Sequence, residues 1–113
     1  MKQIIAIIRP ATVEQVEHVL HELGHFPGLT LFSVSGESRG RAAGHAYEPV
    51  EWDIEEHDNV MMFVICTDEL ASQVVDAISN AAHTGRPGDG VIAVSEISEV
   101  VRIRTGERGE AAV

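Results

Sequence analysis

A strand–helix–strand pattern occurs twice along this chain, and the repeat constrains the fold more than any other sequence feature. In the first half, the nearly all-apolar residues 2–8 predict a buried strand, residues 12–24 predict an amphipathic helix, and residues 29–35 predict a second strand. Thr12 and Gln15 have the spacing of a capping box at the start of that helix.

The second half repeats the pattern with residues 60–65 as a strand, a helix that Asp68 caps, and residues 91–95 as the last strand. A short extended segment, residues 100–104, then precedes a polar tail. Two such halves predict a ferredoxin-like βαββαβ fold of the α/β (α+β) class, with both helices on one face of a four-stranded sheet. A length of 113 residues fits one domain that spans the whole chain.

The first and third predicted strands are apolar on both sides, so the sheet face without helices also needs a cover. In a domain this small, the simplest cover is another copy of the chain. We therefore expect a homo-oligomer.

Acidic residues outnumber basic ones by 18 to 8, which gives a formal net charge of −10. This charge repels phosphate backbones and anionic lipid, so neither a nucleic-acid partner nor membrane insertion is expected. No apolar stretch is long enough to span a bilayer, and the single Cys66 fits a reducing compartment, so a cytoplasmic location is predicted. Cys66 lies in an apolar strand and no serine has a nucleophile-elbow pattern, so we predict no enzyme activity.

Residues 36–59 show neither helical nor strand periodicity. Connections of this length in a compact domain are uncommon, and they are usually functional loops or flexible segments. We predict a long functional loop here, within the single domain.

The glycine-rich residues 84–90 form the strongest local signal for a binding site. Three glycines let backbone N–H groups converge on an anion such as a phosphate. Arg102 and Arg104 stand two positions apart in the predicted extended segment and would project from one face, which suggests a shared anion. Ion pairs of these arginines with nearby glutamates, namely Glu96, Glu99 or Glu107, are the alternative.

These residues resemble the PII signal-transduction family over nearly the whole chain. The resemblance is most specific at 84–90 (Thr-Gly-x-x-Gly-Asp-Gly), 101–107 (Val-Arg-Ile-Arg-Thr-Gly-Glu) and 28–30 (Gly-Leu-Thr). It implies a regulatory homotrimer that binds an adenine nucleotide (ADP, AMP or ATP) in clefts between subunits. It also implies that the long loop docks on a target protein, a transporter or an enzyme.

The resemblance assigns roles to individual positions. Thr30 and its neighbours would hold the adenine, and Arg39 would contact phosphates together with residues of the glycine loop and the last segment. The full nucleotide-binding set that it implies is Thr30, Gly36, Arg39, Gly88, Asp89, Gly90, Arg102 and Arg104.

The chain departs from the family pattern at several positions. Val91 stands where the family has a phosphate-binding lysine, and Trp52 where some members have a uridylylated tyrosine. Gly40 and Asn59 replace the glutamine and lysine of members that sense 2-oxoglutarate. These departures suggest a divergent sensor that responds to an adenine nucleotide but not to 2-oxoglutarate.

Bicarbonate is a candidate second effector. Arg39 and Arg41, with the amides of Gly40 and Gly44, could hold a small oxyanion next to the phosphates. The second-effector and loop set comprises Gly40, Arg41 and His45. The alternative for Arg41 is a solvated loop charge.

Two other functions stay open on the sequence. His18, His21 and His25, or His45 and His57 among acidic residues, could bind a metal in a trimer linked to metal efflux, although neither set has a diagnostic spacing, so no metal site is assigned.

Asp89 could orient a water for slow nucleotide hydrolysis, with stabilisation of the Gly-Asp-Gly turn by an Asx hydrogen bond as its alternative role. His83 could approach a phosphate or cap the second helix.

Overall fold

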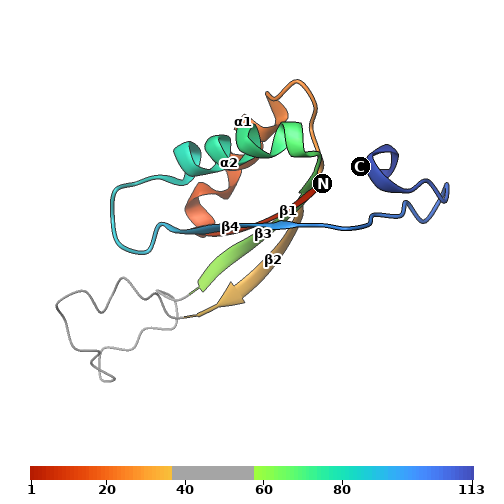
Figure 1. Ribbon diagram of the computed structural model, residues 1–113. Coiled ribbons are helices and arrows are strands. Elements are labelled where there is room, and N and C mark those ends of the chain that lie inside the picture. The colour runs from red at the N-terminus through yellow and green to blue at the C-terminus, as the bar shows by residue number, and fades with distance from the viewer. Residues whose placement is uncertain (37–57) are drawn as a thin grey trace.

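The computed structural model describes residues 1–36 and 58–113. The elements are β1 (Lys2–Ile8), the 3₁₀ helix η1 (Pro10–Thr12), α1 (Val13–His21), β2 (Thr30–Ser35), β3 (Asp58–Cys66), α2 (Asp68–Ala82), β4 (Gly90–Glu96) and the 3₁₀ helix η5 (Gly109–Ala112). The four strands form one antiparallel sheet in the order β2-β3-β1-β4, and both α-helices lie on the same face of it (Figure 1). This confirms the predicted ferredoxin-like fold.

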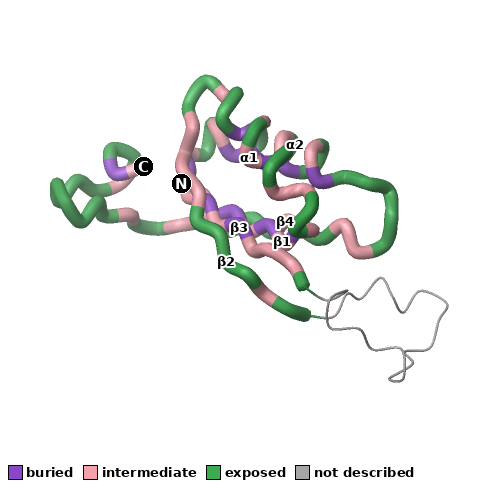
Figure 2. Tube along the Cα trace, turned by 180° about the vertical axis from the view of Figure 1, so that it is seen from behind, coloured by how far each residue is buried: buried purple, intermediate pink, exposed green. Residues whose placement is uncertain are grey.

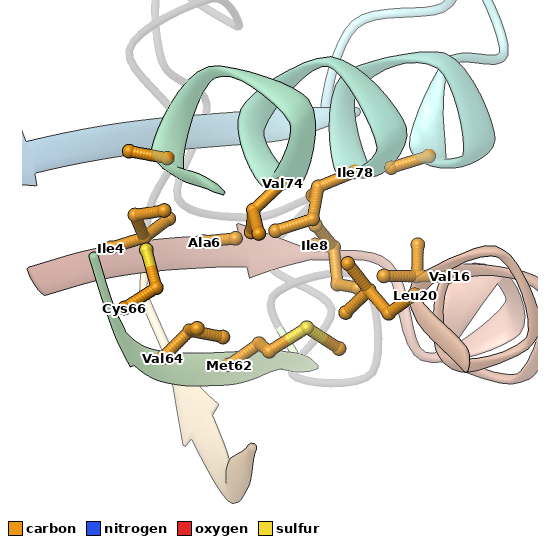
Figure 3. Packing of buried hydrophobic residues seen from close by; sticks show 12 residues of the cluster. Ile4, Ala6, Ile8, Val16, Leu20, Met62, Val64, Cys66, Val74 and Ile78 are labelled. Atoms are coloured by element: carbon orange, nitrogen blue, oxygen red, sulfur yellow. The ribbon is translucent and has the colours of Figure 1, made fainter. Parts of the chain in front are cut away.

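Alternate residues of the two central strands face the helices and form the core (Figure 3). Ile4, Ala6 and Ile8 of β1 lie against Val74 and Ile78 of α2, and all five are at most 1% exposed. Met62, Val64, Cys66, Val16 and Leu20 complete the buried layer. Burial raises the pKa of the Cys66 thiol, as expected for an unreactive side chain.

The opposite face of the sheet is also apolar. One row of paired residues crosses all four strands on this face and consists of Phe32, Met61, Ile7 and Val91. Phe32 is 47% exposed and Val91 is 60% exposed, and in the described part of the chain both α-helices lie on the other face (Figure 2). We refer to the face that carries this row as the open face.

Two helix starts differ from the sequence prediction. The Thr12 hydroxyl donates to the carbonyl of Arg9 over 2.9 Å and caps no N–H group, so the predicted capping box is wrong. Thr67 is the N-cap of α2, while Asp68 is its first residue and accepts a 2.8 Å hydrogen bond from the N-terminal amine. The first helix also ends at His21, three residues before Gly24.

The C-terminal segment differs more from its prediction. Residues 103–105 form a turn, and Val101 pairs with Arg108 in an isolated bridge, so the predicted extended segment 100–104 is wrong. The polar tail then closes into η5, in which Ala112 is 7% exposed.

The long loop is bounded by β2, which ends at Ser35, and by β3, which begins at Asp58, two residues earlier than predicted. Residues 37–57 lie outside the described part of the chain. The predictions for Arg39, Gly40, Arg41, Gly44, His45, Trp52 and His57 fall in this range. Among the residues that are described, no helix is long and apolar enough to cross a membrane.

Candidate functional site

The glycine loop, residues 84–90, connects α2 to β4 and has a backbone that requires glycine. Gly85, Gly88 and Gly90 have φ values of +84°, +95° and +108°. A Cβ on Gly90 would lie 1.7 Å from the carbonyl oxygen of Ile7, so no larger residue fits there. The end of the loop thus packs directly against the end of β1.

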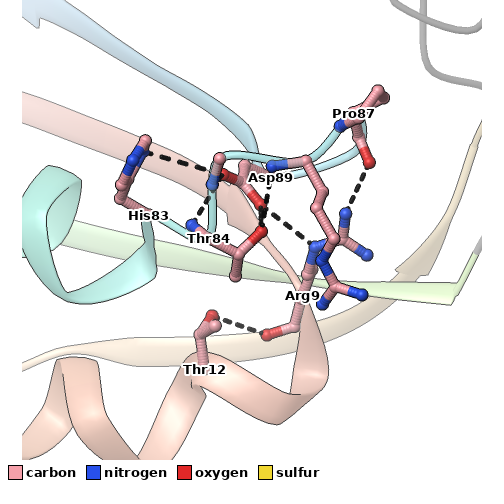
Figure 4. Close-up of polar contacts among 8 residues, drawn as sticks. Arg9, Thr12, His83, Thr84, Pro87 and Asp89 are labelled. Atoms are coloured by element: carbon pink, nitrogen blue, oxygen red, sulfur yellow. Dashed lines mark hydrogen bonds and ion pairs between the residues drawn. The ribbon is translucent and has the colours of Figure 1, made fainter.

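Asp89 holds the loop together through its carboxylate (Figure 4). Oδ2 accepts hydrogen bonds from the backbone N–H groups of Thr84 at 2.8 Å and Gly85 at 2.9 Å, and Oδ1 accepts one from the Thr84 hydroxyl. These bonds, above all the one from the Thr84 hydroxyl, hold the pKa of Asp89 far below its usual range. Asp89 therefore remains ionised at any physiological pH.

The bonding pattern separates the two roles considered for Asp89. The carboxylate reaches back to residues four and five positions earlier, so it stabilises the loop, although not through the expected Asx turn. Its oxygens already accept donors from the protein, which favours the structural role over the orientation of a water.

The free donors of the loop are fewer than the sequence suggested. The N–H groups of Thr84 and Gly85 are bound to Asp89, and that of Arg86 donates to the Thr84 hydroxyl at 3.2 Å. The N–H groups of Gly88 and Asp89 have no acceptor among the residues that the structure describes. An anion would therefore meet the Gly88–Asp89 end of the loop.

Arg9 belongs to this site, and sequence reasoning missed it. Its Nε donates to Oδ1 of Asp89 at 3.2 Å, and its guanidinium also donates to the carbonyl of Pro87. Arg9 directly follows β1, and β1 pairs with β4, which begins at the end of the loop. The sequence does show an arginine directly after a predicted strand. It does not show that this strand pairs with β4, and only that pairing brings Arg9 to the glycine loop.

The extended segment that would place Arg102 and Arg104 on one face is absent, because a turn replaces it. The Arg102 guanidinium donates to the carbonyl of Ala112 at 3.1 Å, and Arg104 is exposed in the turn. Neither forms the alternative ion pairs: Glu96 pairs with Lys2, Glu99 pairs with Arg108, and Glu107 accepts from the Thr105 hydroxyl at 2.8 Å.

One protomer does not bring the predicted site together. The glycine loop precedes β4, while both arginines follow it at the other end of the sheet, a separation of about 20 Å for seven strand residues (Figure 1). Thr30 begins β2 on the opposite edge of the sheet, with β3 and β1 between it and β4. Gly36 follows β2 at the same end of the sheet as the glycine loop, again on the opposite edge.

The histidines of α1 have other partners. His18 Nε2 lies 2.9 Å from Glu22 Oε1, and the ring of His21 stacks on Phe26 with 3.9 Å between centroids. Within residues 1–36 and 58–113, no three His, Cys, Asp or Glu side chains gather as metal ligands.

The fold and the loop define a small α+β domain with a glycine loop at one end of the sheet and, among the described residues, an apolar sheet face that neither α-helix covers. The family model of nitrogen regulatory protein P-II matches residues 1–107, and the chain belongs to this family. It is a PII signal-transduction protein, a regulatory protein and not an enzyme.

Curated relatives align over almost their full lengths. The chain is 41% identical to the nitrogen regulatory protein P-II of Azospirillum brasilense over 113 residues, which covers 100% of both chains. It is 42% identical to the P-II protein of Rhizobium meliloti over 109 residues, 96% of each chain. It is 38% identical to the nitrogen regulatory protein GlnK of Escherichia coli over 113 residues, again 100% of both.

Proposed function

We propose that this PII protein is a cytoplasmic sensor that binds an adenine nucleotide (ADP, AMP or ATP) in clefts between the subunits of a homotrimer. The observation that carries the proposal is the separation of the candidate binding residues within one protomer. The glycine loop and the arginine segment lie at opposite ends of β4, so they can act on one ligand only if two copies each supply a part.

The open face supplies a reason for copies to associate. Its central residues, Ile5, Ile7, Met61 and Phe63, belong to the two middle strands, and Phe32 and Val91 extend the apolar surface to both edges. Burial of apolar surface contributes roughly 25 cal/mol per Å², so a face of this kind favours association over exposure. Three sheets around one axis bring the edge of one sheet to the edge of the next.

The charges around such a cleft suit phosphates. The loop offers the N–H groups of Gly88 and Asp89 together with Arg86, and the second copy would offer Arg102 and Arg104. Arg102 now donates to the Ala112 carbonyl, and a phosphate oxygen is a stronger acceptor because its hydrogen bond is charge-assisted. Thr30 of the edge strand and Gly36, which follows that strand, would lie on the adenine side, and Arg39 would add a further phosphate contact.

The nucleotide acts on a target protein through the loop of residues 36–59. A ligand changes the population of a loop state only when it binds that state better than the others. Bicarbonate is the second effector that we propose, at Gly40, Arg41 and His45, with a transporter or an enzyme as the target. Because Gly40 and Asn59 lack the side chains of 2-oxoglutarate sensors, 2-oxoglutarate is not an effector.

Calorimetry of the purified protein with ADP, AMP and ATP, with and without bicarbonate, tests the proposal, and sedimentation gives the mass of the assembly. We expect a trimer that binds at least one adenylate with micromolar affinity. Arg104→Ala should weaken binding about tenfold. The matched control Arg108→Ala removes an arginine of the same segment that pairs with Glu99, and it should bind normally. A monomer, or a protein that ignores every adenylate, would contradict the proposal.

A further inference from the structure

His83 lies beside the glycine loop. Among the described residues, its side chain makes no hydrogen bond that stabilises the fold. It is the C-cap of α2, with an extended backbone, and its side chain is 74% exposed. Its ring points to the loop and away from the last turn of the helix: Nδ1 lies 3.8 Å from Asp89 Oδ2, and Nε2 lies 3.8 Å from the Cβ position of Gly85 (Figure 4).

The ring is close to the amides that an anion would use. Covalent geometry keeps the N–H of Asp89 within about 4 Å of its own carboxylate, so His83 Nδ1 lies within about 8 Å of that N–H. This distance is about one Debye length at physiological salt, so salt screens only part of the attraction between a charge on the ring and an anion at the amides.

The other charges nearby leave room for a further cation. Arg9 is hydrogen-bonded to Asp89, and the two charges largely offset each other. Arg86 is the remaining charged residue of the loop, and the nearest titratable residue of α2, Asp76, lies seven positions before His83. Asp89 keeps its charge at neutral pH, and histidine is the side-chain type that changes charge near neutrality.

We infer that His83 is a pH-dependent cation of the phosphate site, which in its protonated form attracts the phosphates of a nucleotide held at the Gly88–Asp89 amides. The inference rests on the proposed function. Because the bound anion favours the protonated ring, nucleotide affinity rises as the pH falls through the titration range of histidine. The site then reports intracellular pH together with nucleotide level.

The test measures ADP affinity of the intact protein at about pH 6 and about pH 8 for the wild type, His83→Gln and His83→Arg. ADP phosphates also titrate near pH 6, but this contribution is common to all three proteins and cancels in ratios between them. The affinity ratio between the two pH values should be about fivefold larger for the wild type than for His83→Gln. His83→Arg should bind ADP more tightly than the wild type at about pH 8 and should show the same ratio between the two pH values as His83→Gln.

His18→Gln is the matched control, because His18 is an exposed histidine of α1 that pairs with Glu22, and it should keep the wild-type ratio. NMR of the wild-type ring needs no variant: the titration midpoint of His83 should rise when ADP binds. Equal ratios in wild type and His83→Gln, or an unmoved midpoint, would overturn the role of His83 while ADP binding stands. Failure of ADP to bind at both pH values would overturn the proposed function and this inference with it.

Discussion

The Arg9 guanidinium donates through Nε to Oδ1 of Asp89 over 3.2 Å and so joins two residues 80 positions apart. Arg9 directly follows β1, and Asp89 directly precedes β4. The same guanidinium donates to the Pro87 carbonyl, and the Asp89 carboxylate binds Thr84 and Gly85 from the other side. The conformation of the glycine loop therefore depends on a contact with the opposite end of the sequence.

Asp89→Asn should loosen the loop. An asparagine has one acceptor oxygen where the carboxylate has two, and its NH₂ group faces donors from Thr84, Gly85 and Arg9. We expect a lower melting temperature and a loss of ADP affinity of about tenfold or more. Glu107→Gln, at a carboxylate that accepts only from its own turn, is the control and should change neither value. An unchanged melting temperature in Asp89→Asn would show that the loop does not need the carboxylate.

The lowered pKa of Asp89 predicts that the stability of the protein depends on pH. The pKa of Asp89 is depressed in the folded protein, so its stabilising contribution is fully present above the unfolded value of about 4 and declines as the pH falls below it. Urea unfolding of wild type and Asp89→Asn should give a constant difference in the free energy of unfolding from about pH 5 to pH 8. The difference should shrink below about pH 4. A difference that instead grows in acid would contradict the assignment.

Gly90→Ala should destabilise the protein strongly. The new Cβ would lie 1.7 Å from the Ile7 carbonyl oxygen, and the φ of +108° is unfavourable for alanine. Backbone strain alone costs of order 1–3 kcal/mol, and the steric overlap adds to it. In Gly24→Ala a Cβ meets nothing within 4 Å, so the free energy of unfolding should change by less than about 0.5 kcal/mol. Equal denaturation midpoints for both variants would refute this account of the loop.

Val91→Lys should strengthen nucleotide binding. Val91 follows the glycine loop at the edge of the open face and is 60% exposed, so a lysine there can keep its apolar stem on that face while its ammonium lies beside the phosphate donors. We expect an affinity gain for ATP of about threefold to tenfold. Val94→Lys is the control: this residue of β4 is 48% exposed but pairs with Ile4 on the helix side of the sheet. Calorimetry that finds no gain, or the same gain in both variants, would argue against a phosphate site at this end of β4.

Phe32→Asp should weaken the assembly of subunits. Phe32 lies at one edge of the open face, where it pairs with Met61, and a carboxylate there would be buried without a partner if copies associate through this face. Leu31→Asp is the control, because Leu31 is 39% exposed but pairs with Met62 on the helix side. Sedimentation should show smaller species for Phe32→Asp only. A trimer that survives Phe32→Asp unchanged would place the interface elsewhere.

The sequence by itself determined the local elements. Alternation and helical spacing depend on neighbouring residues, so residues 2–8 were predicted with their observed bounds and the fold class followed from the repeat. The glycine loop could be recognised for the same reason, because its positive φ values are a local demand for glycine. Predictions failed where several hydrogen-bond partners were available to one side chain. The Thr12 hydroxyl, for example, donates to the Arg9 carbonyl and does not accept from a helix N–H.

Only the tertiary structure decided which distant residues meet. Pairing of β1 with β4 brought Arg9 to Asp89, and a turn at residues 103–105 replaced the extended segment that was predicted to carry Arg102 and Arg104 on one face. Contacts of this kind depend on strand order and on the closure of long loops, which no local pattern encodes. The position of the glycine loop and the arginine segment at opposite ends of one strand became visible only when the sheet was complete, and the proposed site shared between copies rests on this position.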